Sequence, residues 1–360
     1  MSSSRSVADA ETGRGRSTPD ESRLIEADSD VRLDLLVASV AGVSRTTAAT
    51  LIATGQVRVD GRHEKASYKP RSGERVEIWR PPRATERAVE PESIALSVVF
   101  EDNDLLVIDK PAGMVVHPAP GNWSGTLVNA LLGRGLARDV GSGKRESEIG
   151  ERESGAIAVP RAGLVHRLDK ETSGLILVAK NERAHRILAK AVADRRVLRQ
   201  YAVLARGHLR SERVVVEKPL ARDPRDRKRM AVVQTGKPAK TTFVRLARFE
   251  GTELLRATLH TGRTHQIRVH LASVGHPVVG DTVYGAAARR RTAGTARETG
   301  RHFLHAAWLR LRHPSSGTLI DLRSPLPPDL RQSLADAARD ARVLQLADPL
   351  DEFDFYRDDA

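Results

Sequence analysis

The chain contains no cysteine, few aromatic residues and no long hydrophobic run. Without cysteine it forms neither disulfides nor thiolate zinc sites, and it has no cysteine nucleophile, a composition that favours a reducing cytoplasm. Aromatic residues make up only 4% of the sequence, so broad base-stacking surfaces are not expected. No apolar run approaches the roughly 18 residues of a membrane span. The polar start MSSSRSVADAETGRGRSTPDES also lacks the hydrophobic segment of a signal peptide. We therefore expect a soluble cytoplasmic protein.

The charge of the chain is strongly positive. Its 59 Lys and Arg exceed its 46 Asp and Glu, so the net charge is 59 − 46 = +13. This excess favours a polyanionic partner, because each phosphate that the protein neutralises releases counterions. A basic protein that binds no polyanion has the same composition, so the partner class stays open at this point. With 40% hydrophobic residues among 360, the chain can form one large domain and a smaller one.

The N-terminal part changes character near Val31. Residues 1–30 are polar and without periodicity, so we expect a disordered tail. A helical face follows at Leu33, Leu36, Val37 and Val40. Ser44 is a candidate N-cap of a second helix, and QVRVDGR predicts a strand and a tight turn.

These details resemble the S4-type RNA-binding domain. The matching segments are RLD, SR, LIATGQVRVDG and SGERVEI, and we assign residues 31–80 to this domain. The resemblance implies that Arg45, Arg58 and Arg62 present positive charge to RNA. A small helical hairpin with solvated basic side chains is the alternative reading of the same residues.

A Pro-rich linker, residues 81–95, separates this domain from a larger one at residues 96–345. In the larger domain strands and helices are mixed without a regular βαβ alternation, which predicts an α+β fold. Residues 134–160 gain Gly, Ser and charge and are expected to be a mobile insertion. Their GSGKR lacks the first Gly of a phosphate loop, because Arg138 stands there. Residues 346–360 are acidic and predicted to fray.

The stretch GLVHRLDKETSGL, residues 163–175, carries a lone carboxylate, Asp169, in front of a buried strand. It resembles the catalytic loop of protein kinases, but Leu168 and Asp169 stand in the opposite order, and neither a Gly-rich phosphate loop nor a D-F-G sequence occurs. From local sequence alone Asp169, between Arg167 and Lys170, could equally be a salt-bridged or turn-capping residue.

Two other chemistries are disfavoured by spacing. A metal site would draw on His166, His265 and His270, but the two histidines of HQIRVH are five residues apart rather than four. A glycosidase would need two carboxylates at a fixed separation, which Asp169 and Glu171, two apart on a loop, do not define.

Several longer segments together resemble the RluA family of pseudouridine synthases, nearest its RluD-like branch. They are PRAGLVHRLDKETSGLILVAK, RQYAVLARG, HTGRTHQIRVHLASVGHPVVGDTVYG, DKPAGMVVHPAPGNWSGTLVNALL and FLHAAWLRLRHP. The resemblance runs from about Leu96 to Pro325, and with the S4-type domain it covers most of the chain. It implies a pseudouridine synthase fold with a mixed, largely antiparallel sheet.

The resemblance also implies roles for individual residues. Asp169 matches the family's essential carboxylate, acting as nucleophile or base, and Arg268 matches the Arg that pairs with it. Tyr201 matches the Tyr that stacks under the target base and takes part in the final proton transfer. Neither a cofactor nor a metal is implied. The candidates for phosphate contacts are Arg167, Arg222, Arg227, Lys228, Arg229 and Arg263, whereas the RRR run at 289–291 is either a further contact or a solvated loop.

The expected partner is RNA, namely 23S ribosomal RNA or a precursor of the large ribosomal subunit. We expect a monomer that binds neither DNA nor a membrane. Two alternatives remain open: a pseudouridine synthase acting on transfer RNA, and a non-catalytic RNA-binding factor of ribosome assembly. The second would not need Asp169, Tyr201 and Arg268 together.

Overall fold

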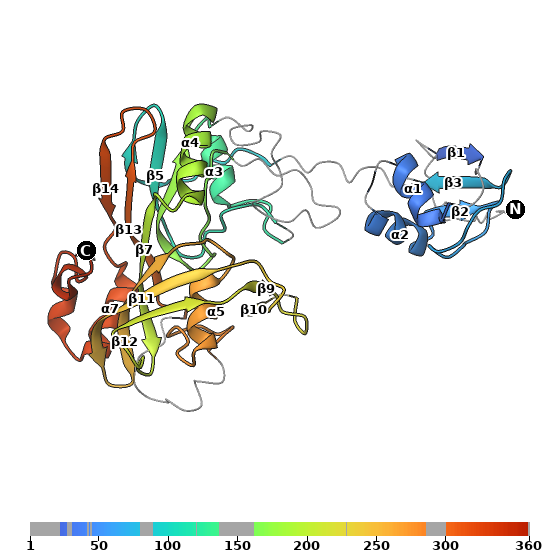
Figure 1. The fold of residues 1–360 in the computed structure, drawn as a ribbon. Helices are drawn as coiled ribbons and strands as arrows, with labels where there is room; N and C mark the ends of the chain where they lie inside the picture. The colour runs from blue at the N-terminus through green and yellow to red at the C-terminus, as the bar shows by residue number, and fades with distance from the viewer. Residues whose placement is uncertain are drawn as a thin grey trace, which may run out of the picture. The chain divides into compact units, whose positions relative to one another are not determined.

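The computed structural model describes the chain in two units that are treated separately (Figure 1). The described residues are 22–26, 31–41, 43, 45–79, 89–119, 121–136, 162–227, 229–285 and 300–358, with residues 22–26 described by their backbone. Residues up to 79 belong to the first unit and residues from 89 to the second. The predictions for Ser44, Lys228, residues 289–291 and almost all of the insertion at 134–160 lie outside the described residues.

The first unit packs two helices, α1 (Leu33–Ala41) and α2 (Arg45–Ala53), on a three-stranded antiparallel sheet. The strand order is β1 (Ser22–Glu26), β3 (Arg75–Trp79) and β2 (Val57–Val59). The core consists of Leu33, Val37, Ala48, Ile52, Val57, Val59, Val76 and Ile78. The prediction of a disordered tail up to residue 30 was wrong for Ser22–Glu26, because this segment pairs with the whole of β3.

No single described helix has the length and apolar composition to cross a membrane. One bent pair, α1 with α2 at 111°, meets that length and composition test when the two helices are taken together.

The second unit is built on a nine-stranded sheet that confirms the predicted α+β class. Its order is β4 (Ser97–Glu101), β5 (Leu105–Lys110), β6 (Ser173–Ala179), β13 (Leu304–Arg312), β7 (Leu198–Arg206), β12 (Thr252–Leu259), β11 (Lys240–Phe249) and β8 (Arg213–Glu217), and β14 (Leu319–Arg323) pairs with β13. Neighbouring strands are antiparallel except β6 and β13. The apolar segment LSVVFEDNDLLVIDK forms β4 and β5, and the buried strand expected after Asp169 is β6.

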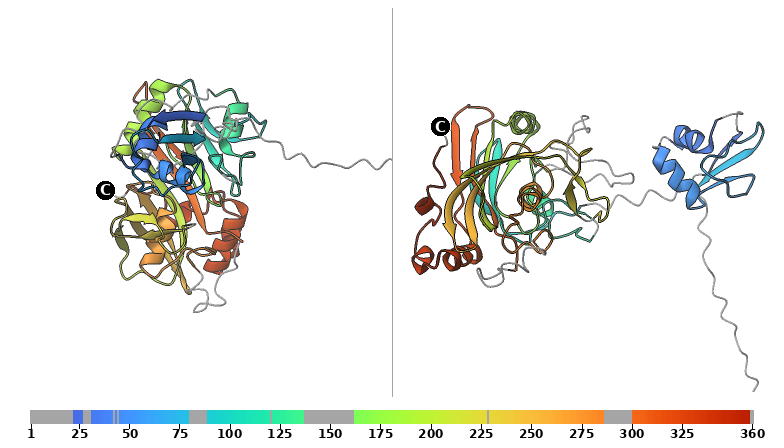
Figure 2. Two further views of the ribbon diagram at one scale, coloured as in Figure 1. Left: turned by 90° about the vertical axis from the view of Figure 1, so that its right-hand side faces the viewer. Right: turned by 60° about the horizontal axis from the view of Figure 1, so that its bottom comes forward.

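Helices flank this sheet: α3 (Leu127–Gly133), α4 (Glu182–Ala193), α5 (Gln266–Ser273) and α7 (Pro328–Ala338). Short local signals start them. Asn181 caps α4 by accepting the Ala184 N–H, and Thr126 forms a capping box with Asn129 at α3. α5 lies inside the curve of β11 and β12 (Figure 2, right-hand view). A basic hairpin outside the main sheet consists of β9 (Leu220–Arg222) and β10 (Met230–Val232).

The parallel contact between β6 and β13 is very short. Only two residue pairs take part, Ser173 with His305 and Gly174 with Ala306. Gly174 has φ +110°, and a Cβ there would lie 2.4 Å from the carbonyl oxygen of Ala306, so a side chain would separate the strands. Asp169 lies on the loop that leads into β6. The close contact between Gly174 and Ala306 therefore fixes the position of this loop relative to β13.

The second unit extends beyond both predicted boundaries. It begins at Val89 rather than Leu96, because Val89 is buried in the main core. It also includes the C-terminal segment, whose predicted fraying was wrong. Leu350 and Phe355 are fully buried, beside a 3-10 turn at Asp351–Phe353. The Arg256 guanidinium donates to the carbonyl oxygens of Phe355 and Arg357, at 2.7 and 2.6 Å. Apolar side chains within an acidic sequence thus anchor the end of the chain.

If this anchor is part of the core, Phe355→Ala should lower the free energy of unfolding of the protein by about 3–5 kcal/mol, because it removes a fully buried ring and leaves a cavity. Denaturant titration followed by circular dichroism measures the change. Leu344→Ala is the control, since that side chain is more than a third exposed and its loss should change stability by less than about 1 kcal/mol. Equal effects for the two variants would contradict the anchoring role.

Candidate active site

Asp169 lies on the loop that enters β6. Its side chain is 15% exposed, whereas the preceding Leu168 is buried in the core. The Asp169 carbonyl oxygen accepts the Thr172 N–H at 3.1 Å, which closes a tight turn and leaves the carboxylate free to point outward from the backbone. The loop therefore presents one carboxylate at the edge of a buried region.

Arg268, in the first turn of α5, links Asp169 to a second carboxylate. Its Nη1 donates to Asp169 Oδ2 at 3.1 Å, while its Nε and Nη2 donate to Asp281 Oδ2 and Oδ1 at 2.7 and 3.0 Å. Asp281 is held in turn by the backbone N–H groups of Val283 and Tyr284. The fork to Asp281 fixes the guanidinium plane, so the remaining N–H reaches Asp169 in a defined direction.

The pKa of Asp169 lies below the ordinary value of an aspartate. Burial raises it, but His265, Arg268 and His302 lower it by more. Burial in turn lowers the pKa of His265, so this imidazole is neutral at neutral pH. Arg268 is then the cation that keeps Asp169 ionised in its partly buried position. The geometry provides one oriented carboxylate suited to act as a nucleophile or a base.

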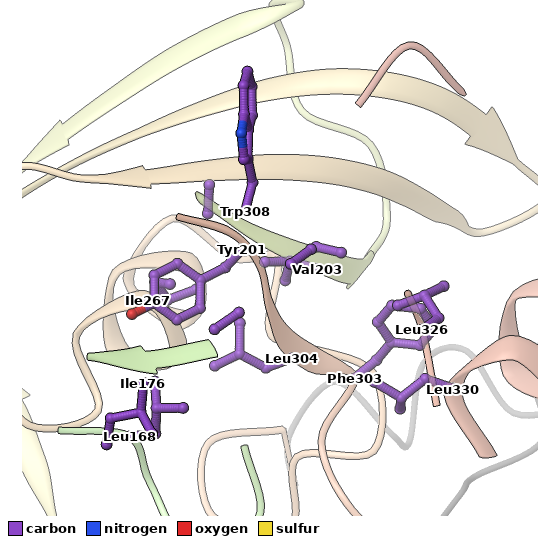
Figure 3. Close-up of a cluster of buried hydrophobic side chains, with 14 of the residues drawn as sticks. Leu168, Ile176, Tyr201, Val203, Ile267, Phe303, Leu304, Trp308, Leu326 and Leu330 are labelled. Atoms are coloured by element: carbon purple, nitrogen blue, oxygen red, sulfur yellow. The ribbon is translucent and has the colours of Figure 1, made fainter. Parts of the chain in front are cut away.

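Tyr201 belongs to β7 and is 4% exposed. Its ring lies in the apolar cluster with Leu168, Ile176, Ile267 and Leu304 (Figure 3). Burial raises the pKa of the Tyr201 hydroxyl, and the charge of Asp169 raises it further. The positive charge of Arg199 opposes these effects but is outweighed, so the phenol is protonated at neutral pH.

Known proteins identify the family. The family model described as RNA pseudouridylate synthase matches residues 104–273, and that of the S4 domain matches residues 31–76. The chain is 42% identical over 295 residues to Ribosomal large subunit pseudouridine synthase D of Nitrosomonas europaea, covering 82% of this chain and 80% of that protein. The chain belongs to the RNA pseudouridylate synthase family.

The chain is also 38% identical to an uncharacterized RNA pseudouridine synthase of Bacillus subtilis, covering 85% of this chain and 94% of that protein. These sequence relatives and the two family models confirm the resemblance noted from sequence motifs at the level of family, and the chain is an RNA pseudouridine synthase with an S4 domain. Among solved structures, Human RNA Pseudouridylate Synthase Domain Containing 1 is 28% identical, with a TM-score of 0.46, covering 67% of this chain and 86% of that one.

Three residues that sequence reasoning did not single out support the site of this synthase. Asp281 orients Arg268, as described above. Lys110 is fully buried, and its Nζ donates to the carbonyl oxygens of Pro111, Met114 and Lys170, at 2.7, 3.0 and 3.1 Å. Burial lowers the pKa of Lys110 to about 7. Three carbonyl acceptors match the three N–H bonds of an ammonium group, so we infer that Lys110 remains charged near neutrality.

His302 is the third of these residues. Its Nε2 lies 2.9 Å from Oγ1 of Thr172, at the end of the loop that carries Asp169. In the sequence, Lys110 and Asp281 lie within the quoted motif segments, in DKPAG and VVGD, and His302 directly precedes the segment FLHAAWLRLRHP. None of those segments shows which partner each side chain meets.

The candidate RNA contacts fall into two groups. In the first unit, Arg58 and Arg62 are exposed, with Arg58 stacked 5.4 Å from the Trp79 ring centre. Arg45 Nε forms a 3.0 Å ion pair with the buried Asp34, so it has a structural partner as well as an exposed side chain. In the second unit the described candidates are Arg167, Arg222 and Arg227, which are exposed, and Arg229 and Arg263, which are half-buried.

The three histidines considered for a metal site do not converge. His166 accepts the Leu177 N–H, His270 contacts Thr241 and the Lys218 carbonyl oxygen, and His265 contacts Tyr284. No group of three or more metal-ligating side chains occurs in the part of the chain that the structure describes.

His302 should make the protein sensitive to acid. Burial, followed by the charge of Arg268, lowers its pKa to about 4, against about 6.5 in an unfolded chain. Between these values the unfolded state binds a proton that the folded state does not, so stability falls as pH drops from 6.5 towards 4. On acidification from pH 6.5 to 4, the free energy of unfolding of His302→Gln should therefore fall by about 3 kcal/mol less than that of the wild type.

Urea titrations of both proteins at pH 7 and pH 4.5 test this expectation. The exposed His208, changed to Gln, is the matched control and should follow the wild-type pH dependence. If His302→Gln loses as much stability on acidification as wild type, the buried imidazole is not the source of acid sensitivity.

Proposed function

We propose that this enzyme converts uridine to pseudouridine in large-subunit ribosomal RNA, with Asp169 as its catalytic carboxylate. The observation that carries the assignment is the ionised Asp169, held by Arg268 against Asp281 at the edge of a buried cluster. The substrate class is supported by the name of the Nitrosomonas europaea relative, Ribosomal large subunit pseudouridine synthase D. A ribosomal RNA substrate implies action in the cytoplasm, and we expect a monomer.

The reaction breaks the glycosidic bond between the sugar carbon and uracil nitrogen 1, turns the free base and joins its carbon 5 to the sugar. Asp169 can begin this in two ways. It attacks the anomeric carbon and displaces uracil as an anion, or it removes a proton from the neighbouring sugar carbon and the same bond breaks. Both routes require the ionised carboxylate that Arg268 maintains. In the first route carbon 5 attacks the anomeric carbon and displaces Asp169. In the second, carbon 5 bonds to the anomeric carbon and the proton taken by Asp169 returns to the neighbouring sugar carbon. Both routes end with loss of the proton on carbon 5.

Tyr201 is proposed to support the target base. Its aromatic ring can stack against the uracil ring. Because burial keeps the Tyr201 hydroxyl protonated, this group can accept the carbon 5 proton only after it has lost its own. The base must leave its helix or loop to reach this depth, which costs a few kcal/mol. Phosphate contacts by Arg167, Arg222, Arg227, Lys228, Arg229 and Arg263 are proposed to offset that cost.

The proposal predicts the effect of Asp169→Asn. The amide has the shape of the carboxylate but is neither charged nor nucleophilic, so pseudouridine formation should fall by at least about 10³-fold while RNA affinity changes little. Tritium release from transcribed 23S ribosomal RNA labelled at carbon 5 of uridine measures the rate, and filter binding measures affinity.

Glu171→Gln is the matched control, because it changes a neighbouring carboxylate on the same loop. Its rate should remain within about threefold of wild type. Substantial turnover by Asp169→Asn would rule out the proposed chemistry, and activity on transfer RNA instead of ribosomal RNA would correct the substrate.

The first unit is proposed to add RNA affinity through phosphate contacts at Arg58 and Arg62. Reversing both charges to Glu should weaken binding and reduce the slope of log affinity against log salt by about two units, one per lost contact. Filter binding over a salt series on one ribosomal RNA fragment measures this. Arg45 is kept, because its pair with Asp34 makes a charge reversal there a test of folding as well.

The control reverses two other exposed basic residues, Arg186 and Arg210 of the second unit. It should leave the salt slope unchanged. A slope equal to wild type in the Arg58 and Arg62 variant would mean that this face of the S4 domain does not contact the RNA.

A further inference from the structure

Tyr284 lies between the basic hairpin and the residues around Asp169. Its hydroxyl oxygen accepts the backbone N–H of Met230, in β10, at 3.0 Å. The same hydroxyl lies 2.8 Å from Nδ1 of His265, the N-cap residue that precedes α5. His265 Nε2 is in turn 4.0 Å from Asp169 Oδ2. One hydroxyl thus connects the hairpin backbone to the imidazole beside the catalytic carboxylate.

The Met230 N–H at one end of this series of contacts decides where the Tyr284 hydrogen can lie. The Met230 N–H can only donate, so the Tyr284 oxygen is an acceptor there and its own hydrogen is free for His265. Burial lowers the pKa of His265, and the neutral ring has one acceptor nitrogen. If Nδ1 accepts from Tyr284, the proton of the imidazole is on Nε2 and faces Asp169. With Nδ1 as the acceptor, the Tyr284 hydroxyl would favour the tautomer whose Nε2–H faces the ionised Asp169.

The Tyr284 ring makes a second link between the same two regions. The guanidinium carbon of Arg229, next to Met230 in the hairpin, lies 5.2 Å from the ring centre. The guanidinium carbon of Arg268, which binds Asp169, lies 5.1 Å from it. Both distances are within the range of cation–π attraction. Movement of the hairpin relative to α5 would disturb the hydroxyl chain and these two contacts together.

His265 is also fixed by an uncommon backbone conformation. It has φ +55°, a left-handed value that costs energy for a residue other than glycine. Gln266, the next residue, accepts the Arg263 N–H and the Thr261 hydroxyl and so holds the preceding turn. A strained position beside the catalytic carboxylate is maintained by its surroundings, and Tyr284 is one of the contacts that maintain it.

We propose that Tyr284 is a positioning residue that couples the basic hairpin, residues 220–232, to the catalytic carboxylate. RNA held by the hairpin fixes Met230 and Arg229 against Tyr284, and Tyr284 fixes His265 and Arg268 around Asp169. The inference rests on the proposed function, because it assigns Tyr284 a part in the Asp169 reaction.

Tyr284→Phe tests the coupling because it keeps the ring and removes both hydroxyl contacts. At saturating 23S ribosomal RNA, the single-turnover rate of tritium release should fall about tenfold, while the filter-binding affinity should stay within about twofold of wild type. Tyr356→Phe is the matched control in the same unit, since it removes a hydroxyl that binds Asp348 away from the site, and it should leave the rate unchanged. An unchanged rate in Tyr284→Phe would overturn the proposal.

A double-mutant comparison separates coupling from a local defect. Arg227→Ala removes an exposed hairpin cation, so in the wild-type background it should weaken binding and also slow the rate at saturating RNA by about threefold. In the Tyr284→Phe background it should weaken binding by the same factor but leave the rate unchanged. If Arg227→Ala slows both backgrounds equally, or neither, the hairpin is not coupled to the chemistry through Tyr284.

Asp169→Asn, assayed in parallel, separates this inference from the proposed function. If Asp169→Asn is inactive and Tyr284→Phe turns over like wild type, the proposed function stands and the coupling is wrong. If Asp169→Asn retains activity, the site assignment itself has failed.

Discussion

The arrangement of the catalytic unit depends on one buried cation shared by two carboxylates. Arg268 meets Asp281 with a two-point fork and Asp169 with a single N–H. A buried charge without a partner is strongly destabilising, so the three groups must arrive together as the protein folds. The helix that carries Arg268, the turn at Asp281 and the loop before β6 are consequently fixed relative to one another. Removing the Arg268 guanidinium would leave two partly buried carboxylates without their cation.

The loop that carries Asp169 is held on both sides by backbone contacts. On one side, Lys110 and the Gly113 N–H bind the Lys170 carbonyl oxygen. On the other, Arg301 donates to the Glu171 carbonyl oxygen at 2.9 Å and forms a fork with Asp329. These contacts satisfy carbonyl groups of the loop that precedes β6, which have no partner in the sheet ladder. The loop that carries Asp169 is therefore held by charged side chains just before the strand begins.

The sequence predicted those features whose information is local or carried by a motif. Strands, turns and caps followed from apolar periodicity and polar start signals, as at Asn181, and motif resemblance brought Asp169 and Arg268 together. Asp281, Lys110 and His302 were missed because their roles depend on partners from other elements, such as Lys170 for Lys110 and Thr172 for His302. The buried C-terminus was missed for a related reason. Its acidic residues dominate the composition, but two apolar side chains, Leu350 and Phe355, decide its burial.

The charge balance at the site has the opposite sign to that of the whole protein. The chain carries +13, which attracts the phosphates of RNA to its surface. Arg268 with Asp169 and Asp281 has a net charge of 1 − 2 = −1, and burial keeps His265 neutral beside them. A phosphate is repelled from such a position, whereas a neutral base is not. The basic exterior and the anionic group around Arg268 together favour an arrangement in which the RNA backbone stays at the surface and a flipped uracil enters. Under the proposed function, the charge of Asp169 would then also select which part of the nucleotide reaches it.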